Sequence, residues 1–134
     1  MLSALPCGTA VCVVHAAIGF AIVGGWFVLF GCGAVSFVVK REPPPWYWRL
    51  LGLLQVLLIL QLLAGGILLL SARRADSFLH YLYGAVFPAI VLVATHVTAR
   101  RMADEADTWK AFAIAAFFVF GLTLRALTTG LGMP

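Results

Sequence analysis

One stretch decides the fold: LLGLLQVLLILQLLAGGILLL, residues 50–70. It runs for 21 residues without one charged side chain. A helix of about 20 apolar residues crosses the hydrocarbon core of a bilayer, which is about 30 Å thick. The core offers no water to unpaired backbone N–H and C=O groups, so a spanning segment has to be helical. We therefore expect a transmembrane helix at residues 46–70.

Three other stretches have the same character, and the whole composition agrees with them. Of the 134 residues, 63% are hydrophobic and 10% are charged, whereas soluble domains are about 25% charged. The connections are short, so helices that follow one another should lie antiparallel as neighbours. The sequence predicts a single all-α domain over residues 1–134, an integral membrane four-helix bundle with antiparallel up-down neighbours. The expected spans are 11–39, 46–70, 78–99 and 109–130.

The formal net charge of +4 is concentrated near the ends of the spans. Basic residues form no stripe on a polar helix face, so nucleic acid is not an expected partner. The first and third connections, with their flanks, hold six basic residues: Lys40, Arg41, Arg49, Arg100, Arg101 and Lys110. The second connection holds only Arg73 and Arg74, and the N-terminal tail holds none. By the positive-inside rule, both termini should lie outside a membrane, which we expect to be a bacterial cytoplasmic membrane.

Two histidines are expected at similar depth near the outer face. His15 is close to the start of the first span and His80 is close to the start of the third. With a rise of 1.5 Å per residue, their depths should agree within roughly 5 Å. His96 follows His80 by 16 residues, which places it about 24 Å deeper along a helix. Only His15 and His80 can therefore share one site.

Each of these two histidines is followed four residues later by a glycine, Gly19 or Gly84. That spacing places the glycine on the same helix face, one turn deeper. A flat macrocycle between two axial imidazoles needs missing side chains beside its ligands, so the pattern predicts one haem b with iron held by His15 and His80. Its propionates would meet basic residues at the same end: Arg73, Arg74 and Arg125.

A purely structural interpretation of the same residues stays open. His80 can be an interfacial residue, His15 can bond a neighbouring helix, and Arg125 can reach outward or pair with Asp76. Gln55 and Gln61 are expected to hydrogen-bond other helices. Other expectations concern helix ends and packing: a helix contact along Ala17, Ala21 and Gly25, a kink at Pro88, an N-cap at Asp107 or Thr108, and an optional Cys7–Cys12 bridge.

The ionisable residues restrict the function. No Asp or Glu lies within a predicted span, which argues against proton-coupled transport. No catalytic constellation is visible, so the chain is not expected to be an enzyme by itself. The leading hypothesis is a small polytopic subunit of a larger membrane assembly, in respiratory or photosynthetic electron transfer, such as a non-catalytic subunit of a membrane oxidoreductase. The alternatives are a homo-oligomeric channel or transporter for a small solute, using Gln55, Gln61 and Arg125, and a cofactor-free scaffold subunit.

Overall fold

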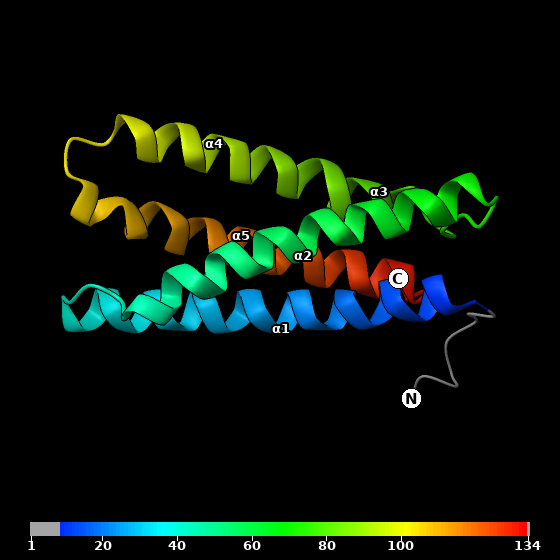
Figure 1. The fold of residues 1–134 in the computed structure, drawn as a ribbon, viewed down its shortest axis with the longest axis horizontal. Helices are drawn as coiled ribbons and strands as arrows, with labels where there is room; N and C mark the ends of the chain where they lie inside the picture. Colours follow the sequence, from blue (N-terminus) through cyan, green and yellow to red (C-terminus); the bar gives the residue numbers. More distant parts are fainter. Residues whose placement is uncertain (1–8, 134) are drawn as a thin grey trace.

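The computed structural model describes residues 9–133 as a bundle of helices, with no strand among them (Figure 1). The third predicted span is divided into an α-helical turn, a π-helical segment and a longer α-helix. In chain order the elements are α1 (Ala10–Val39), α2 (Pro45–Leu70), α3 (Leu79–Tyr81), the π-helix η2 (Leu82–Val86), α4 (Phe87–Arg101), the 3-10 helix η3 (Glu105–Asp107) and α5 (Thr108–Gly130).

Four helical stretches are long and apolar enough to cross a membrane: Ala10–Val39, Pro45–Leu70, Leu79–Arg101 and Glu105–Gly130. The expectation of an all-α protein with four candidate spans is confirmed. The bounds of the long helices lie within one or two residues of those expected from the sequence. The optional Cys7–Cys12 bridge lies outside the described residues, because Cys7 does.

The outward faces of the bundle carry many large apolar side chains. Leu70 is 90% exposed, Val38 is 78% exposed and Phe78 is 72% exposed. A soluble monomer rarely exposes a large continuous apolar surface, and a helix that is apolar all round belongs in a membrane or a protein core. The apolar surface of the described residues and the four candidate spans suggest a membrane protein.

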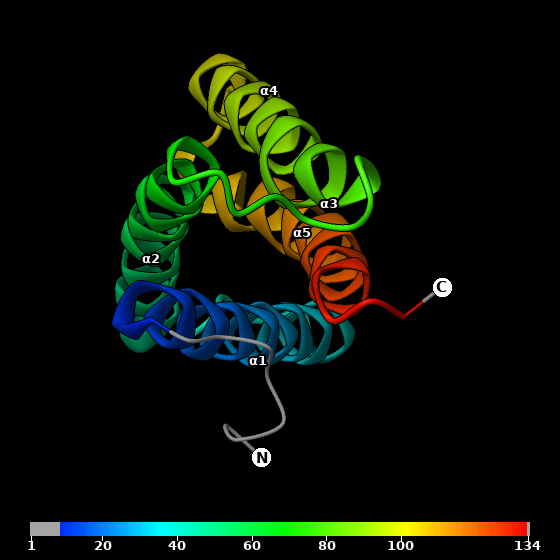
Figure 2. The same cartoon turned by 90° about the vertical axis from the view of Figure 1, so that its right-hand side faces the viewer.

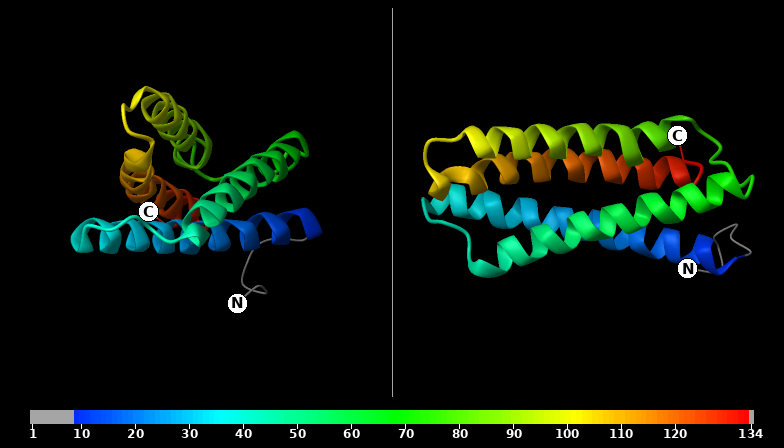
Figure 3. Two further views of the ribbon diagram at one scale, coloured as in Figure 1. Left: turned by 60° about the vertical axis from the view of Figure 1, so that its left-hand side comes forward. Right: turned by 45° about the horizontal axis from the view of Figure 1, so that its top comes forward.

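The helices lie lengthwise beside one another around α1 and α5. The N-terminal end of α1, the C-terminal end of α5 and the α2–α3 connection are at one end of the long axis, and the other two connections are at the opposite end (Figures 1 and 3). α1 packs against α5 and α2, and α5 also packs against α3, η2 and α4. The buried core lies between α1, α2 and α5; it consists of Ile22, Trp26, Leu29, Tyr47, Leu51, Leu54, Leu58, Trp109, Phe112, Ala116 and Val119.

α2 and α4 make at most marginal contact with each other. The expectation that sequential spans are packed neighbours therefore fails for the second and third spans. Viewed along the bundle, α2 and α4 lie apart on the side away from the α1–α5 contact (Figure 2). The separation leaves a groove between them, lined by apolar residues from both helices.

Two glycines of α1 explain why this helix can approach two neighbours closely. A Cβ at Gly25 would overlap the side chain of Leu54 in α2. A Cβ at Gly33 would lie 2.5 Å from the Cβ of Ala113 in α5 and 3.3 Å from its Cα. Of the expected ridge, only Gly25 makes such a contact, because Ala17 and Ala21 are exposed. The missing side chains let the helix backbones approach, as in many membrane helix pairs.

The third span changes its helical winding before Pro88. The π-helix η2 covers Leu82–Val86, and Pro88 is the second residue of α4. Proline has no N–H to continue the helical ladder, and a π-helical turn is one of the recognised ways in which a helix accommodates such a break. The kink expected at Pro88 stays a prediction, and the observed change is a π-helical segment that ends two residues before this proline.

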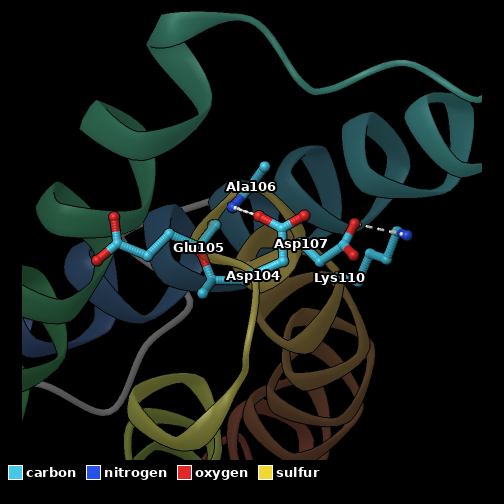
Figure 4. Close-up of polar contacts among 6 residues, drawn as sticks. Asp104, Glu105, Ala106, Asp107 and Lys110 are labelled. Carbon is cyan, nitrogen blue, oxygen red and sulfur yellow. Dashed lines mark hydrogen bonds and ion pairs between the residues drawn. The ribbon is translucent and has the colours of Figure 1, made fainter.

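In the α4–α5 connection, the short helix η3 is capped by Asp104, a residue that the sequence did not single out. The carboxylate of Asp104 accepts a hydrogen bond of 2.9 Å from the N–H of Ala106 (Figure 4). Asp107 is the N-cap of α5 but makes no side-chain capping bond, and it pairs instead with Lys110 at 2.8 Å. Aspartate caps a helix by accepting from an unpaired backbone N–H, and here the short helix η3 takes that bond.

We expect Tyr47→Phe to lower the free energy of unfolding by about 0.5–1.5 kcal/mol, which is the usual loss for one buried hydrogen bond. The Tyr47 hydroxyl donates to the carbonyl of Trp109 at 3.3 Å, and both side chains are buried between α2 and α5. Reversible unfolding in detergent, followed by circular dichroism, would measure the change. A variant as stable as the wild type would contradict a stabilising role for this bond.

Candidate functional site

The structure brings His15 and His80 together at one end of the bundle. His15 lies on α1 and His80 on α3, and their ring centroids are 6.1 Å apart with an interplanar angle of 72°. The N-terminal end of α1 and the element α3 lie at the same end in Figure 1. Two imidazoles that are far apart in the sequence therefore lie edge to face at the same end of the bundle.

His80 is held by α5 in one tautomer. Its Nδ1 lies 2.8 Å from the carbonyl oxygen of Ala126. A carbonyl can only accept, so Nδ1 carries the hydrogen and, in the neutral ring, Nε2 keeps the lone pair. The ring packs where Gly130 has no side chain, because a Cβ there would come within 2.8 Å of the His80 Cε1. α5 thus supplies both the bond and the space that fix this ring.

His15 is held by α2, and the contact leaves two polar atoms without partners. A Cβ at Gly65 would lie 3.2 Å from the His15 Cε1, so this glycine makes room for the ring. The Gln61 Nε2 donates to the His15 carbonyl oxygen at 2.8 Å. The His15 Nδ1 and the Gln61 Oε1 are buried without a hydrogen-bond partner within residues 9–133. Buried polar atoms are normally satisfied, so these two are the atoms of the site that a bound polar group could pair with.

Gly19 and Gly84 each lie against a neighbouring helix. A Cβ at Gly19 would lie 3.2 Å from the Gln61 Nε2, and one at Gly84 would lie 3.4 Å from the Ala126 Cβ. The missing side chain of Gly19 is what lets Gln61 reach the backbone of α1. Gln61 thus bonds another helix as expected, whereas Gln55 bonds the Leu51 carbonyl within its own helix at 3.4 Å.

The basic residues are distributed around the same end of the bundle. Arg73 and Arg74 are exposed in the connection between α2 and α3. Arg125 is half-buried on α5, one position before the residue that bonds His80. It lines a cavity of about 260 Å³ together with Asp76, Ser77 and Thr129. Only Arg125 is therefore part of the packed bundle, and it shares its cavity with a carboxylate.

His96 takes no part in this pair. Its ring packs edge-on against Phe112 at 5.1 Å between centroids, and its Nδ1 lies 2.8 Å from the Leu92 carbonyl of its own helix. No group of three or more His, Cys, Asp or Glu residues suited to a metal ion occurs among residues 9–133. The site therefore has two imidazole donors and no third protein ligand of these types in that part of the chain.

Sequence reasoning missed the residues that hold the histidines: Gly65, Ala126 and Gly130. Spacing within one helix relates His15 to Gly19, but nothing in the sequence relates it to a glycine of another helix. The pair Gly65-Gly66 in a leucine-rich helix was the one visible signal, because paired glycines weaken a helix and favour close packing there.

No protein-family model, curated protein or solved structure matches this chain. The class that the fold defines is an all-α protein with four helices that are long and apolar enough to span a membrane. Its best-defined polar feature in the described residues is the pair of imidazoles between α1 and α3.

Proposed function

We propose that this chain is a small integral subunit of a larger membrane assembly in respiratory or photosynthetic electron transfer, and that it carries one haem b between His15 and His80. The observation that carries the proposal is the 6.1 Å separation of the two imidazole centroids. Two imidazoles that share one metal ion, with bonds of about 2.0–2.1 Å each, have ring centroids about 6 Å apart. A bound haem would supply one-electron transfer near the outer face.

The donor chemistry supports axial ligation. The Nδ1–H of His80 donates to a backbone carbonyl; a metal-binding histidine is usually oriented by such a bond, which leaves Nε2 as the ligand atom. His15 has a buried nitrogen without a partner in the described residues. The His80 ring is anchored by its bond to Ala126 on α5, and the His15 ring packs beside Gly65 of α2.

The space for a porphyrin has to be made by displacement. The positions beside Gly19 and Gly84 are filled by Gln61 and Ala126. Gln61 is a flexible side chain, and swinging away from the His15 carbonyl would free one of these two positions. Ala126 lies on the helix that bonds His80, so room there requires α3 and α5 to separate slightly. Arg125, Arg73 and Arg74 are the residues proposed to meet the propionates.

A cofactor-free scaffold is the second candidate, and the closed packing at the two glycines favours it. In that case the Gln61–His15 and His80–Ala126 hydrogen bonds simply join neighbouring helices. Each is worth about 1 kcal/mol. Transport has less support, because Gln55 lines the α2–α4 groove and Arg125 lines a separate cavity.

Haem analysis of the purified native assembly separates these candidates. We expect a b-type reduced-minus-oxidised spectrum and one haem per chain by pyridine haemochrome. Protein that is isolated with its partners attached but contains no haem would refute the haem proposal and favour the scaffold. A stable homo-oligomer without other subunits would instead favour the channel or transporter.

The same proposal includes insertion as an antiparallel up-down bundle with both termini outside the cytoplasmic membrane. The basis is the excess of basic residues in the first and third connections. A reporter fused after residue 134 should therefore be active only if it functions outside the cytoplasm, and one inserted in the α1–α2 connection should show the opposite compartment. Cytoplasmic activity of the C-terminal fusion would reverse the orientation.

A further inference from the structure

The groove between α2 and α4 is a second feature, at the opposite end of the third span from His80. It has a volume of about 490 Å³, within the usual range for small-molecule sites. α2 contributes Leu58, Ile59 and Leu62, and α4 contributes Ala89, Val93 and Arg100, among others. We call this feature the α2–α4 groove. It exists because these two helices diverge, and neither α1 nor α5 contributes a lining residue.

The length of the groove matches one leaflet of a bilayer. Its lining on α4 runs from Ala89 to Arg100, and eleven residues of helix extend about 16 Å. That is about half of the 30 Å hydrocarbon core. A site of this length, open along the side of a membrane bundle, suits an acyl chain that lies parallel to the helices.

The two ends of the groove differ in polarity. Along most of its length the lining is aliphatic, but Arg100 is exposed at the end near the α4–α5 connection and is followed by Arg101. His96, one turn earlier on α4, also lines the groove. A basic residue at the interface beside an apolar channel between helices is the arrangement that binds anionic lipid headgroups. Arginine is well suited to pair with phosphate oxygens.

We propose that the α2–α4 groove binds one anionic phospholipid from the leaflet at the α4–α5 end. Its phosphate lies at Arg100, and one acyl chain runs past Val93 toward Ala89. The apolar length and the single cationic end select an amphiphile with an anionic head. This site is independent of the His15–His80 pair.

Native mass spectrometry of the detergent-purified protein, titrated with phosphatidylglycerol or phosphatidylcholine, tests the proposal. We expect tighter binding of phosphatidylglycerol. Arg100→Gln should weaken it about five-fold, since one basic residue near the surface contributes about that factor. Arg49→Gln is the matched control, because Arg49 is exposed at the same end of the bundle but does not line the groove. Its phosphatidylglycerol affinity should stay at the wild-type value.

A second pair of variants tests the acyl-chain part of the groove. Ala89→Phe should fill its far end and weaken binding of both lipids, whereas Ala94→Phe should not, because Ala94 is an exposed residue of α4 outside the lining. Equal affinity for the two lipids, or equal effects of Arg100→Gln and Arg49→Gln, would overturn the proposal. A photo-crosslinking residue at position 89 that captures a polypeptide and no lipid in the membrane would overturn it in favour of a partner helix.

Discussion

Replacing His15 or His80 with alanine is expected to abolish haem retention, while His96→Ala leaves the haem content unchanged. Each of the first two changes removes one of the two proposed iron ligands, whose rings lie 6.1 Å apart. His96 packs against Phe112 and is not part of the pair. The haem content of each variant, purified with its partners attached, is measured by pyridine haemochrome and by reduced-minus-oxidised spectroscopy.

Loss of haem has to be separated from loss of the fold. His80→Ala also removes the bond to Ala126 and leaves a void beside Gly130. Circular dichroism and elution volume should therefore be unchanged before the haem result is interpreted. Adding free imidazole to the alanine variants gives a second readout, because a missing ligand can be replaced in the void but a missing fold cannot. Wild-type haem content in either alanine variant would show that this histidine is not an axial ligand.

The two glycines beside the histidines extend the same experiment. Gly19→Leu and Gly84→Leu should each lower haem content, because the added side chain occupies the space that the ring needs. Gly19→Leu also displaces Gln61 from the His15 carbonyl, at a position where a Cβ would already lie 3.2 Å from the Gln61 Nε2. Gln61→Leu is the control for that effect. It removes the hydrogen bond to the His15 carbonyl but adds no side chain at position 19 of α1.

Gly25→Leu is expected to lower the free energy of unfolding by about 1–3 kcal/mol, the usual cost of overpacking a well-packed core. A Cβ at this position overlaps Leu54, which is only 1% exposed in the core between α1 and α2. Because Leu54 is enclosed by its neighbours, it cannot swing out of the way without shifting α2. Unfolding in detergent, followed by circular dichroism, and the yield of extracted protein would both report the change.

The adjacent Gly24 is a matched control. A Cβ at Gly24 meets nothing within 4 Å, so Gly24→Leu makes the same chemical change on the same helix without a clash. Its stability should equal or slightly exceed that of the wild type, since leucine is the better helix former. Gly33→Leu and Gly31→Leu repeat the comparison at the α1–α5 contact. If Gly25→Leu were as stable as Gly24→Leu, the close approach of α1 and α2 would be refuted.

Most of the fold could be predicted from the sequence because a bilayer leaves few choices. A charge-free run such as residues 50–70 has to be helical and has to end where charged residues and prolines begin, so the bounds of the spans followed directly. The depth of His15 and His80 followed from counting residues along two helices. Gln61 was expected to bond another helix, because a membrane offers an amide side chain no other partner.

The lateral arrangement could not be predicted, because it depends on surfaces that face each other only after folding. Short connections suggested that all sequential spans pack, yet α2 and α4 diverge. Gly25 and Gly33 let α1 approach α2 and α5 closely, whereas α4 packs against α5 and not against α2. The α2–α4 groove is what remains, and no residue pattern within a single span indicates it.

The sequence by itself determined that this protein has four apolar helices and that two histidines lie near one end. These properties depend on length, polarity and rise per residue, which each helix carries alone. Only the tertiary structure decided that Gly65 and Gly130 make room for the histidine rings, that Gln61 fills the space beside Gly19, and that Arg100 lies at the end of a groove. Each of these is a contact between helices, and a contact needs two surfaces whose relative position no single segment encodes.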